Sequence, residues 1–165
     1  MFFMKLTCNS INILLFILLL GIAADALAAI SGQNLLTEKH ISISPGAKGT
    51  VVVFMSAKCP CSNSHVKIMK TLASEFKEFS FVAIHSNSDE DLALSKNYFK
   101  SIDLPFPTLE DKNGKIADEF KALKTPHAFV INPDGQILYK GGVTSSTHGE
   151  TADKHFLQDA LTHDL

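Results

Sequence analysis

The stretch from Thr50 to Ser56 constrains the fold most, because everything between its two hydroxyl ends is apolar, in the order Val-Val-Val-Phe-Met. An unbroken apolar run rich in β-branched residues is typical of a central strand that is buried on both faces. Soon after it, beyond Cys59, apolar residues recur three and four positions apart, with lysines between them, which predicts an amphipathic helix. These apolar positions are Val66, Met69, Leu72, Ala73 and Phe76. A buried strand followed at once by such a helix predicts an α/β domain.

The rest of the chain continues this alternation. We predict further strands at 40–44, 79–85, 108–109, 128–132 and 136–140, and helices at 88–102, 115–123 and 150–161. The sequence Pro133-Asp134-Gly135 is a turn signal, and it makes the last two strands a hairpin. Strands alternating with helices predict a sheet that is covered by helices on both faces. The chain has 165 residues, which fits a single domain of this kind.

The N-terminal segment is interpreted separately. Lys5 precedes an uncharged apolar run, and Ala26-Leu27-Ala28 supplies a small-x-small site. These features are typical of a secretory signal peptide, so we predict a signal peptide at 1–28 and a periplasmic or secreted domain at 29–165. An uncleaved membrane anchor is the alternative, although the run is short for a membrane span. Cleavage after Ala28 would remove Cys8 and leave two cysteines, in a compartment where disulfides persist.

The two remaining cysteines flank a proline where the predicted strand gives way to the helix. Unpaired N–H groups and the positive end of the helix dipole would stabilise an anion at Cys59, and Lys58 adds a positive charge. A thiol with a lowered pKa is a reactive nucleophile. Cys61 could then attack a mixed disulfide at Cys59 and release a reduced partner. Pro60 suits a first helical position. A structural cysteine pair, or two inert buried thiols, is the alternative.

The order of these features resembles the thioredoxin fold. The resemblance rests on the buried strand, Cys59-Pro60, the amphipathic helix, and Thr125-Pro126 before a strand and an Asp-Gly hairpin. It extends over about residues 35–163 and is greatest for the exported redoxin branch, which is related to thioredoxin-like domains of cytochrome-maturation proteins and to peroxiredoxin-like proteins. The implied architecture is a central mixed sheet flanked by helices on both faces.

The resemblance also implies a function. Cys59 and Cys61 would be the catalytic thiols, and Pro126 would follow a cis peptide bond and pack against the active disulfide. Thr125 would offer backbone groups to a substrate, with Pro60 on the same surface. The implied partners are protein thiols and disulfides, with a membrane or periplasmic redox partner. No organic cofactor and no resident metal are expected.

The sequence departs from this family pattern near the thiols. Thioredoxins usually have Cys-x-x-Cys, but Ser62 stands at the second cysteine position and the other thiol comes one residue early. A disulfide across one intervening residue closes a small ring, so we expect a more oxidising couple if it forms. If it does not form, Cys59 would act alone or with a partner's thiol. Val53 stands where thioredoxins carry a buried acid, and Lys58 replaces the usual aromatic residue, so proton transfer must be arranged differently.

Two other functions remain open. Peroxiredoxins carry Pro-x-x-x-Thr-x-x-Cys and an arginine that polarises the peroxide. Ser56 could replace the threonine, but Val52 stands at the proline position and all fifteen cationic side chains are lysines. Copper(I) or zinc could be bound by Cys59, Cys61 and His65, with His127 approaching the same site. Because a histidine on a helix surface is usually solvated, we expect His65 to be exposed.

Charge and turn composition argue against nucleic-acid and nucleotide partners. The net charge is −2 and the isoelectric point is about 6.4, so no basic field attracts a polyanion. The glycine-containing turns at 112–114 and 134–135 do not form glycine-rich loops at a helix start, as a phosphate cradle requires.

Overall fold

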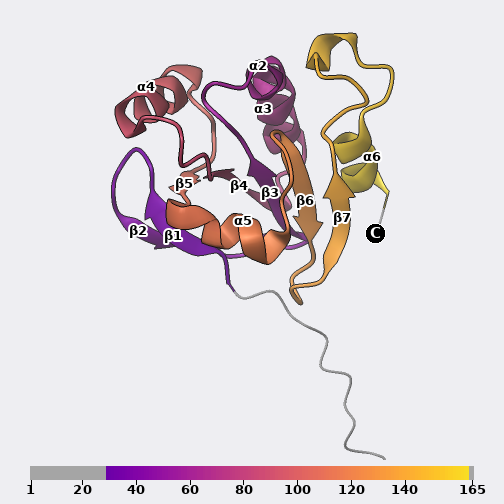
Figure 1. Cartoon of the computed structure of the whole chain (residues 1–165). Coiled ribbons are helices and arrows are strands. Elements are labelled where there is room, and N and C mark those ends of the chain that lie inside the picture. The colour runs from indigo at the N-terminus through magenta and orange to yellow at the C-terminus, as the bar shows by residue number, and fades with distance from the viewer. Residues whose placement is uncertain (1–28, 164–165) are drawn as a thin grey trace, which may run out of the picture.

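A single mixed sheet organises the computed structural model, which describes residues 29–163 (Figure 1). The strand order is β2-β1-β5-β4-β3-β6-β7. The strands are β1 (Ser31–Asn34), β2 (His40–Ser42), β3 (Gly49–Phe54), β4 (Phe79–His85), β5 (Thr108–Glu110), β6 (His127–Ile131) and β7 (Ile137–Gly141). β3, β4 and β5 are parallel, and the other pairings are antiparallel. The predicted signal peptide, 1–28, lies outside the described residues.

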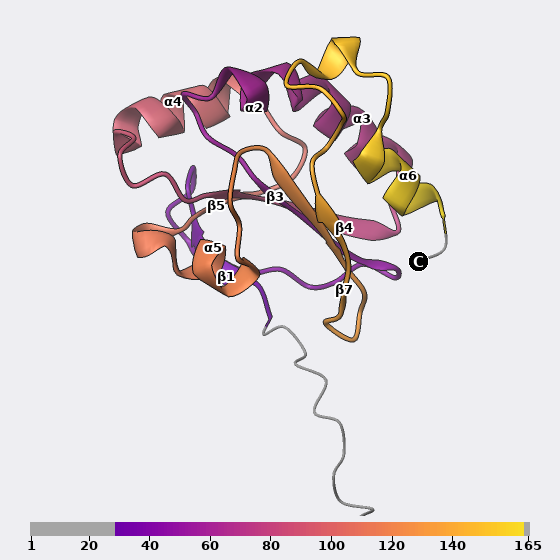
Figure 2. The ribbon, with the colours of Figure 1, turned by 45° about the vertical axis from the view of Figure 1, so that its right-hand side comes forward.

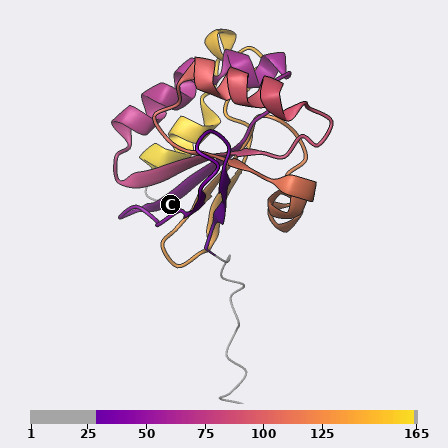
Figure 3. The same ribbon diagram turned by 90° about the vertical axis from the view of Figure 1, so that its left-hand side faces the viewer.

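Helices cover both faces of this sheet, as predicted. They are α2 (Pro60–Ser64), α3 (Val66–Glu75), α4 (Leu92–Ile102), α5 (Lys115–Phe120) and α6 (Phe156–Thr162), with short 3₁₀ turns η1 (Lys112–Gly114) and η2 (Gly149–Thr151). α3, α4 and α6 lie on one face and α5 on the other, as Figures 2 and 3 show from two further sides. No helix within 29–163 is long and apolar enough to cross a membrane.

The core lies on both sides of β3, whose residues are all buried. Val51 and Val53 pack toward α3, α4 and α6, while Val52 and Phe54 pack on the opposite face with Phe120 of α5. This two-sided burial is what the unbroken apolar run predicts for a central strand. Because β3 and β4 are parallel neighbours, their carboxyl ends lie at the same edge of the sheet.

The single helix expected after Cys61 is two helices that meet at His65. The carbonyl oxygen of Cys61 accepts a hydrogen bond from His65 Nδ1 at 2.7 Å, and the backbone N–H of His65 bonds instead to the oxygen of Ser62 at 3.2 Å. A side chain thus takes the acceptor that would continue the regular backbone ladder. The helix is interrupted one turn beyond the thiols.

The C-terminal part differs more from the prediction. The helix expected at 150–161 begins only at Phe156, after η2 and an irregular stretch. Leu157 and Leu161 are buried as expected, but Phe156 is 37% exposed. Residues 142–155 instead run back over α2 and α3, where Gly149 N–H donates to Ser64 Oγ at 3.3 Å. Strand β1 was not predicted from the sequence.

Candidate active site

Cys59 lies directly between the strand end and the helix start. It is the N-cap residue of α2, with extended backbone angles (φ −78°, ψ 115°), and Pro60 is the first helical residue, as predicted. Pro60 is exposed, whereas Cys59 and Cys61 are each partly exposed. Both thiols are free. This placement presents both sulfurs at the carboxyl edge of the parallel strands.

The Cys59 thiol contacts the loop before β6. Its Sγ donates to the carbonyl oxygen of Thr125 at 3.4 Å, and the Thr125–Pro126 peptide bond is cis, as the thioredoxin resemblance implies. Partial burial raises the pKa of Cys59, but hydrogen bonds from the Ser62 amide, the Thr125 side chain and Cys61 outweigh it, so the pKa lies below the ordinary thiol value. Cys59 therefore holds a larger thiolate fraction at neutral pH than a free cysteine.

Cys61 has the opposite shift. Partial burial raises its pKa, and so do its hydrogen bond to Cys59 and the negative charge that Cys59 can carry. Cys61 lines a hollow of about 180 Å³. The other lining residues are His65, Lys124, Thr125, Pro126 and residues 142–147. The predicted catalytic residues and Thr125 and Pro126 therefore meet in one place.

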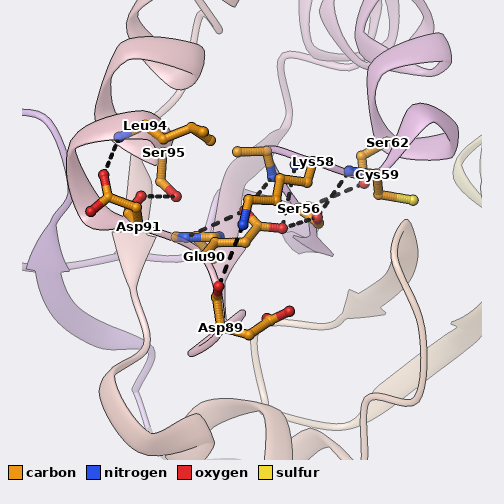
Figure 4. Close-up of polar contacts among 11 residues, drawn as sticks. Ser56, Lys58, Cys59, Ser62, Asp89, Glu90, Asp91, Leu94 and Ser95 are labelled. Atoms are coloured by element: carbon orange, nitrogen blue, oxygen red, sulfur yellow. Dashed lines mark hydrogen bonds and ion pairs between the residues drawn. The ribbon is translucent and has the colours of Figure 1, made fainter.

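Behind Cys59 lies a buried polar cluster, which we define as Ser56, Ser62 and Glu90 (Figure 4). The backbone N–H of Cys59 donates to Ser56 Oγ at 3.1 Å, and the N–H of Ser56 donates to Ser62 Oγ at 3.1 Å. The Ser56 hydroxyl donates to Glu90 Oε1. Ser62, at the second cysteine position of the family pattern, is fully buried and turned inward.

Sequence reasoning missed Glu90. Glu90 follows β4 within the triplet Asp89-Glu90-Asp91, and this acidic run beyond a strand parallel to β3 is the signal that could have indicated it. The Lys58 ammonium donates to the carbonyl oxygen of Asp89 at 3.4 Å, so it is directed to this loop (Figure 4).

The expectation that His65 is solvated is wrong. The side chain is 2% exposed, its Nδ1 donates to the Cys61 carbonyl, and its Nε2 bonds to Thr144 Oγ1 at 2.9 Å. The returning segment 142–149 covers it, which local sequence does not reveal. Within residues 29–163, no group of three or more His, Cys, Asp or Glu side chains is arranged to hold a metal ion.

His127 does not join the thiols. It is buried on the α5 side of β6, where its ring lies 4.6 Å from that of Phe129 between centroids and its Nδ1 accepts from the Leu123 N–H at 3.2 Å. Burial lowers its pKa, and the nearby charges of Lys140 and Lys124 lower it further. His127 follows Pro126 directly in sequence, but side chains of successive strand residues point to opposite faces of the sheet. The His127 ring therefore lies on the opposite face.

The fold and the two neighbouring thiols define a thioredoxin-like protein. The model of the AhpC/TSA family matches residues 25–140, so the chain belongs to this family. A solved structure of similar fold is a secreted Mycobacterium tuberculosis disulfide oxidoreductase homologous to E. coli DsbE. It has a TM-score of 0.63 and 18% identity, with 81% of this chain and 95% of that one covered.

Curated relatives are similar over a shorter region. Thiol-disulfide oxidoreductase ResA of Bacillus thuringiensis subsp. konkukian is 30% identical over 91 residues, which are 55% of this chain and 53% of the relative. Thiol:disulfide interchange protein CycY of Rhizobium leguminosarum bv. viciae is 30% identical over 118 residues, or 71% of this chain and 61% of the relative. The chain thus spans about half the length of the first of these relatives.

Proposed function

We propose that this protein is a thiol-disulfide oxidoreductase that acts on the cysteines of other proteins. The observation that carries the proposal is the pair Cys59 and Cys61, two adjacent free thiols whose pKa values are displaced in opposite directions. When the pKa values of two neighbouring thiols are shifted in opposite directions, the thiol with the lower pKa is the attacking group and the other remains protonated until it resolves the mixed disulfide. The names of the ResA and CycY relatives support the same reaction class.

The reaction divides between the two thiols. The Cys59 thiolate attacks one sulfur of a partner's disulfide, forming a mixed disulfide and releasing the partner's other sulfur as a thiolate that takes up a proton. Cys61 then loses its proton and attacks the Cys59 sulfur, which forms the Cys59–Cys61 disulfide and releases the second partner thiol. The partner gains two electrons and two protons. The reverse sequence oxidises a partner.

The surface around the thiols is proposed to hold the partner chain. Pro60 is exposed beside Cys59, and Thr125 and Pro126 line the hollow into which Cys61 opens. A peptide segment around a cysteine could lie along Thr125 and Pro126 while its sulfur approaches Cys59. The Thr125 carbonyl, which now accepts the Cys59 thiol, would become available once that thiol has reacted.

The proposal also includes export of the protein from the cytoplasm. Residues 1–28 have the composition of a signal peptide, and the similar M. tuberculosis structure is described as that of a secreted protein. We propose that the protein works in the periplasm or outside the cell, where a membrane or periplasmic redox partner restores its starting state. An N-terminal anchor is the alternative, and detection of a mature chain beginning at residue 29 would separate the two.

The decisive test is the reduction of insulin disulfides by the full chain and by Cys59→Ser. Loss of turnover is expected for Cys59→Ser, and unchanged turnover for Cys8→Ser, whose cysteine lies in the predicted signal peptide. Retained turnover in Cys59→Ser would contradict the proposal. So would a wild type that consumes peroxide but leaves insulin intact, which would indicate a thiol peroxidase.

A mass measurement tests the role of Cys61 separately. The oxidised protein should be lighter than the reduced protein by two hydrogen atoms, with the linkage mapped to the peptide containing Cys59 and Cys61. Equal masses after treatment with an oxidised partner would rule out Cys61 as the resolving thiol.

A further inference from the structure

Glu90 is a buried carboxylate held by one short segment of chain. Its side chain is 2% exposed. It accepts hydrogen bonds from the Ser56 hydroxyl, from the Ala57 N–H at 2.9 Å and from the Lys58 N–H at 3.3 Å. Burying a carboxylate is costly unless it is well hydrogen-bonded, so these donors compensate for its loss of water. All of them belong to the three residues that directly precede Cys59.

The link from Glu90 to Cys59 passes through a single hydroxyl group. A serine hydroxyl has one proton to donate, and that of Ser56 is given to Glu90. The Ser56 oxygen can therefore only accept from the Cys59 N–H, at 3.1 Å. Without Glu90 the hydroxyl would be free to rotate toward other acceptors. The orientation that receives the Cys59 backbone thus depends on the carboxylate.

Other titratable groups also face Glu90. His85 Nε2, from β4, lies 3.9 Å from Glu90 Oε2. Burial raises the pKa of Tyr98, from α4, and the negative charges of Cys59 and Glu90 raise it further. The ammonium of Lys58 is directed to the Asp89 carbonyl instead. The titration of the Cys59 thiol therefore has to be separated from that of Tyr98 in any pH experiment.

We propose that Glu90 is the positioning residue of the thiol site, and that it acts through Ser56 to hold Cys59 where the Ser62 amide and the Thr125 side chain can hydrogen-bond its sulfur. This inference rests on the proposed function only in taking Cys59 as the reactive thiol. Glu90 does not touch the sulfur or a substrate. Its effect is to keep the first turn of α2 in register with the end of β3.

The test follows the alkylation of Cys59 against pH in the full-length protein, with each cysteine resolved by peptide mass spectrometry. Loss of the positioning contacts weakens the hydrogen bonds to the sulfur. The pH at the midpoint of Cys59 alkylation should therefore rise in Glu90→Gln and Ser56→Ala. A rise of one pKa unit slows alkylation below the midpoint about tenfold. Ser56→Ala leaves the Ala57 and Lys58 bonds to Glu90 in place, so it tests the link even if the Glu90 variant folds poorly.

Asp91→Asn is the matched control. Asp91 is the neighbouring acid, exposed, and its side chain accepts from the Leu94 N–H at 2.9 Å to cap α4 (Figure 4). This variant should lower the melting temperature slightly and leave the Cys59 midpoint unchanged. A lower melting temperature with a wild-type midpoint in both Glu90→Gln and Ser56→Ala would overturn the inference. Cys59→Ser could lose insulin turnover while the pH midpoint of Cys59 alkylation in Glu90→Gln stays at the wild-type value. That result would refute only the positioning role and leave the proposed function intact.

Discussion

The two sides of Cys59 differ in how their contacts are made. On the closed side, Ser56, Ser62 and Glu90 form buried hydrogen bonds among themselves and to the Cys59 backbone. On the open side, Cys61, Thr125 and Pro126 line a hollow of about 180 Å³, where we propose that a partner's peptide segment docks. The residues that influence the protonation and position of Cys59 are therefore different from those that control access to it. Variants on the closed side should change reactivity toward any reagent, and those on the open side should change turnover of protein partners.

The largest effect is expected from Cys61→Ser on the open side. Without the second thiol, the mixed disulfide at Cys59 cannot be resolved, so insulin reduction should stop after one partner thiol is released per protein molecule. A covalent complex should accumulate on a non-reducing gel. Alkylation of Cys59 by a small reagent should remain within a few-fold of wild type. Full turnover in this variant would mean that the partner's own thiol resolves the complex.

His65→Ala tests the support beneath the open side. The variant opens a cavity and removes the hydrogen bonds of the buried His65 ring to Thr144 Oγ1 and to the Cys61 carbonyl oxygen. The free energy of unfolding should fall by about 3 kcal/mol, as measured by urea denaturation. His148→Ala, exposed on the same returning segment, should stay within about 0.5 kcal/mol of wild type. A similar loss in both variants would show that the segment, rather than the His65 contacts, determines the stability.

The double variant Cys61→Ser, Ser62→Cys moves the second thiol from the open side to the closed side. With two intervening residues the ring is less constrained, so the disulfide between Cys59 and the relocated thiol should be harder to reduce than the original pair. A glutathione redox titration should give a more negative midpoint potential. Replacing the Ser62 hydroxyl weakens the bond from the Ser56 N–H, at a cost of about 1 kcal/mol. An unchanged potential would mean that the one-residue spacing is not strained.

The smallest effect is expected from His127→Phe, which lies on neither side. The lowered pKa of His127 means that the unfolded chain takes up a proton first as pH falls below about 6.5, so stability decreases over that range. His127→Phe keeps a ring against Phe129 but cannot titrate. Urea midpoints at about pH 7.5 and about pH 5 should therefore differ less in the variant than in wild type. An altered Cys59 reactivity would place His127 in the thiol site after all.

Much of the fold could be predicted because its central elements carry strong local patterns. The apolar run at β3 and the strand Phe79–His85 were placed correctly, since a strand buried on both faces is predominantly apolar. Cys59 as N-cap and Pro60 as first helical residue follow from the preferences of a helix start. Prediction failed at β1 and at 142–155, whose conformations depend on distant partners.

Local sequence was enough to establish the strand-to-helix junction at Cys59 and Pro60, because burial and helix-start preferences act over neighbouring residues. The fold was needed to reveal that Glu90, far along the chain from Cys59, lies behind it through Ser56, and that His65 is buried. The parallel pairing of β3 with β4 places Glu90 beside Ser56, and segment 142–149 buries His65 by returning over it. Such contacts depend on where the chain returns in space, which no local periodicity encodes.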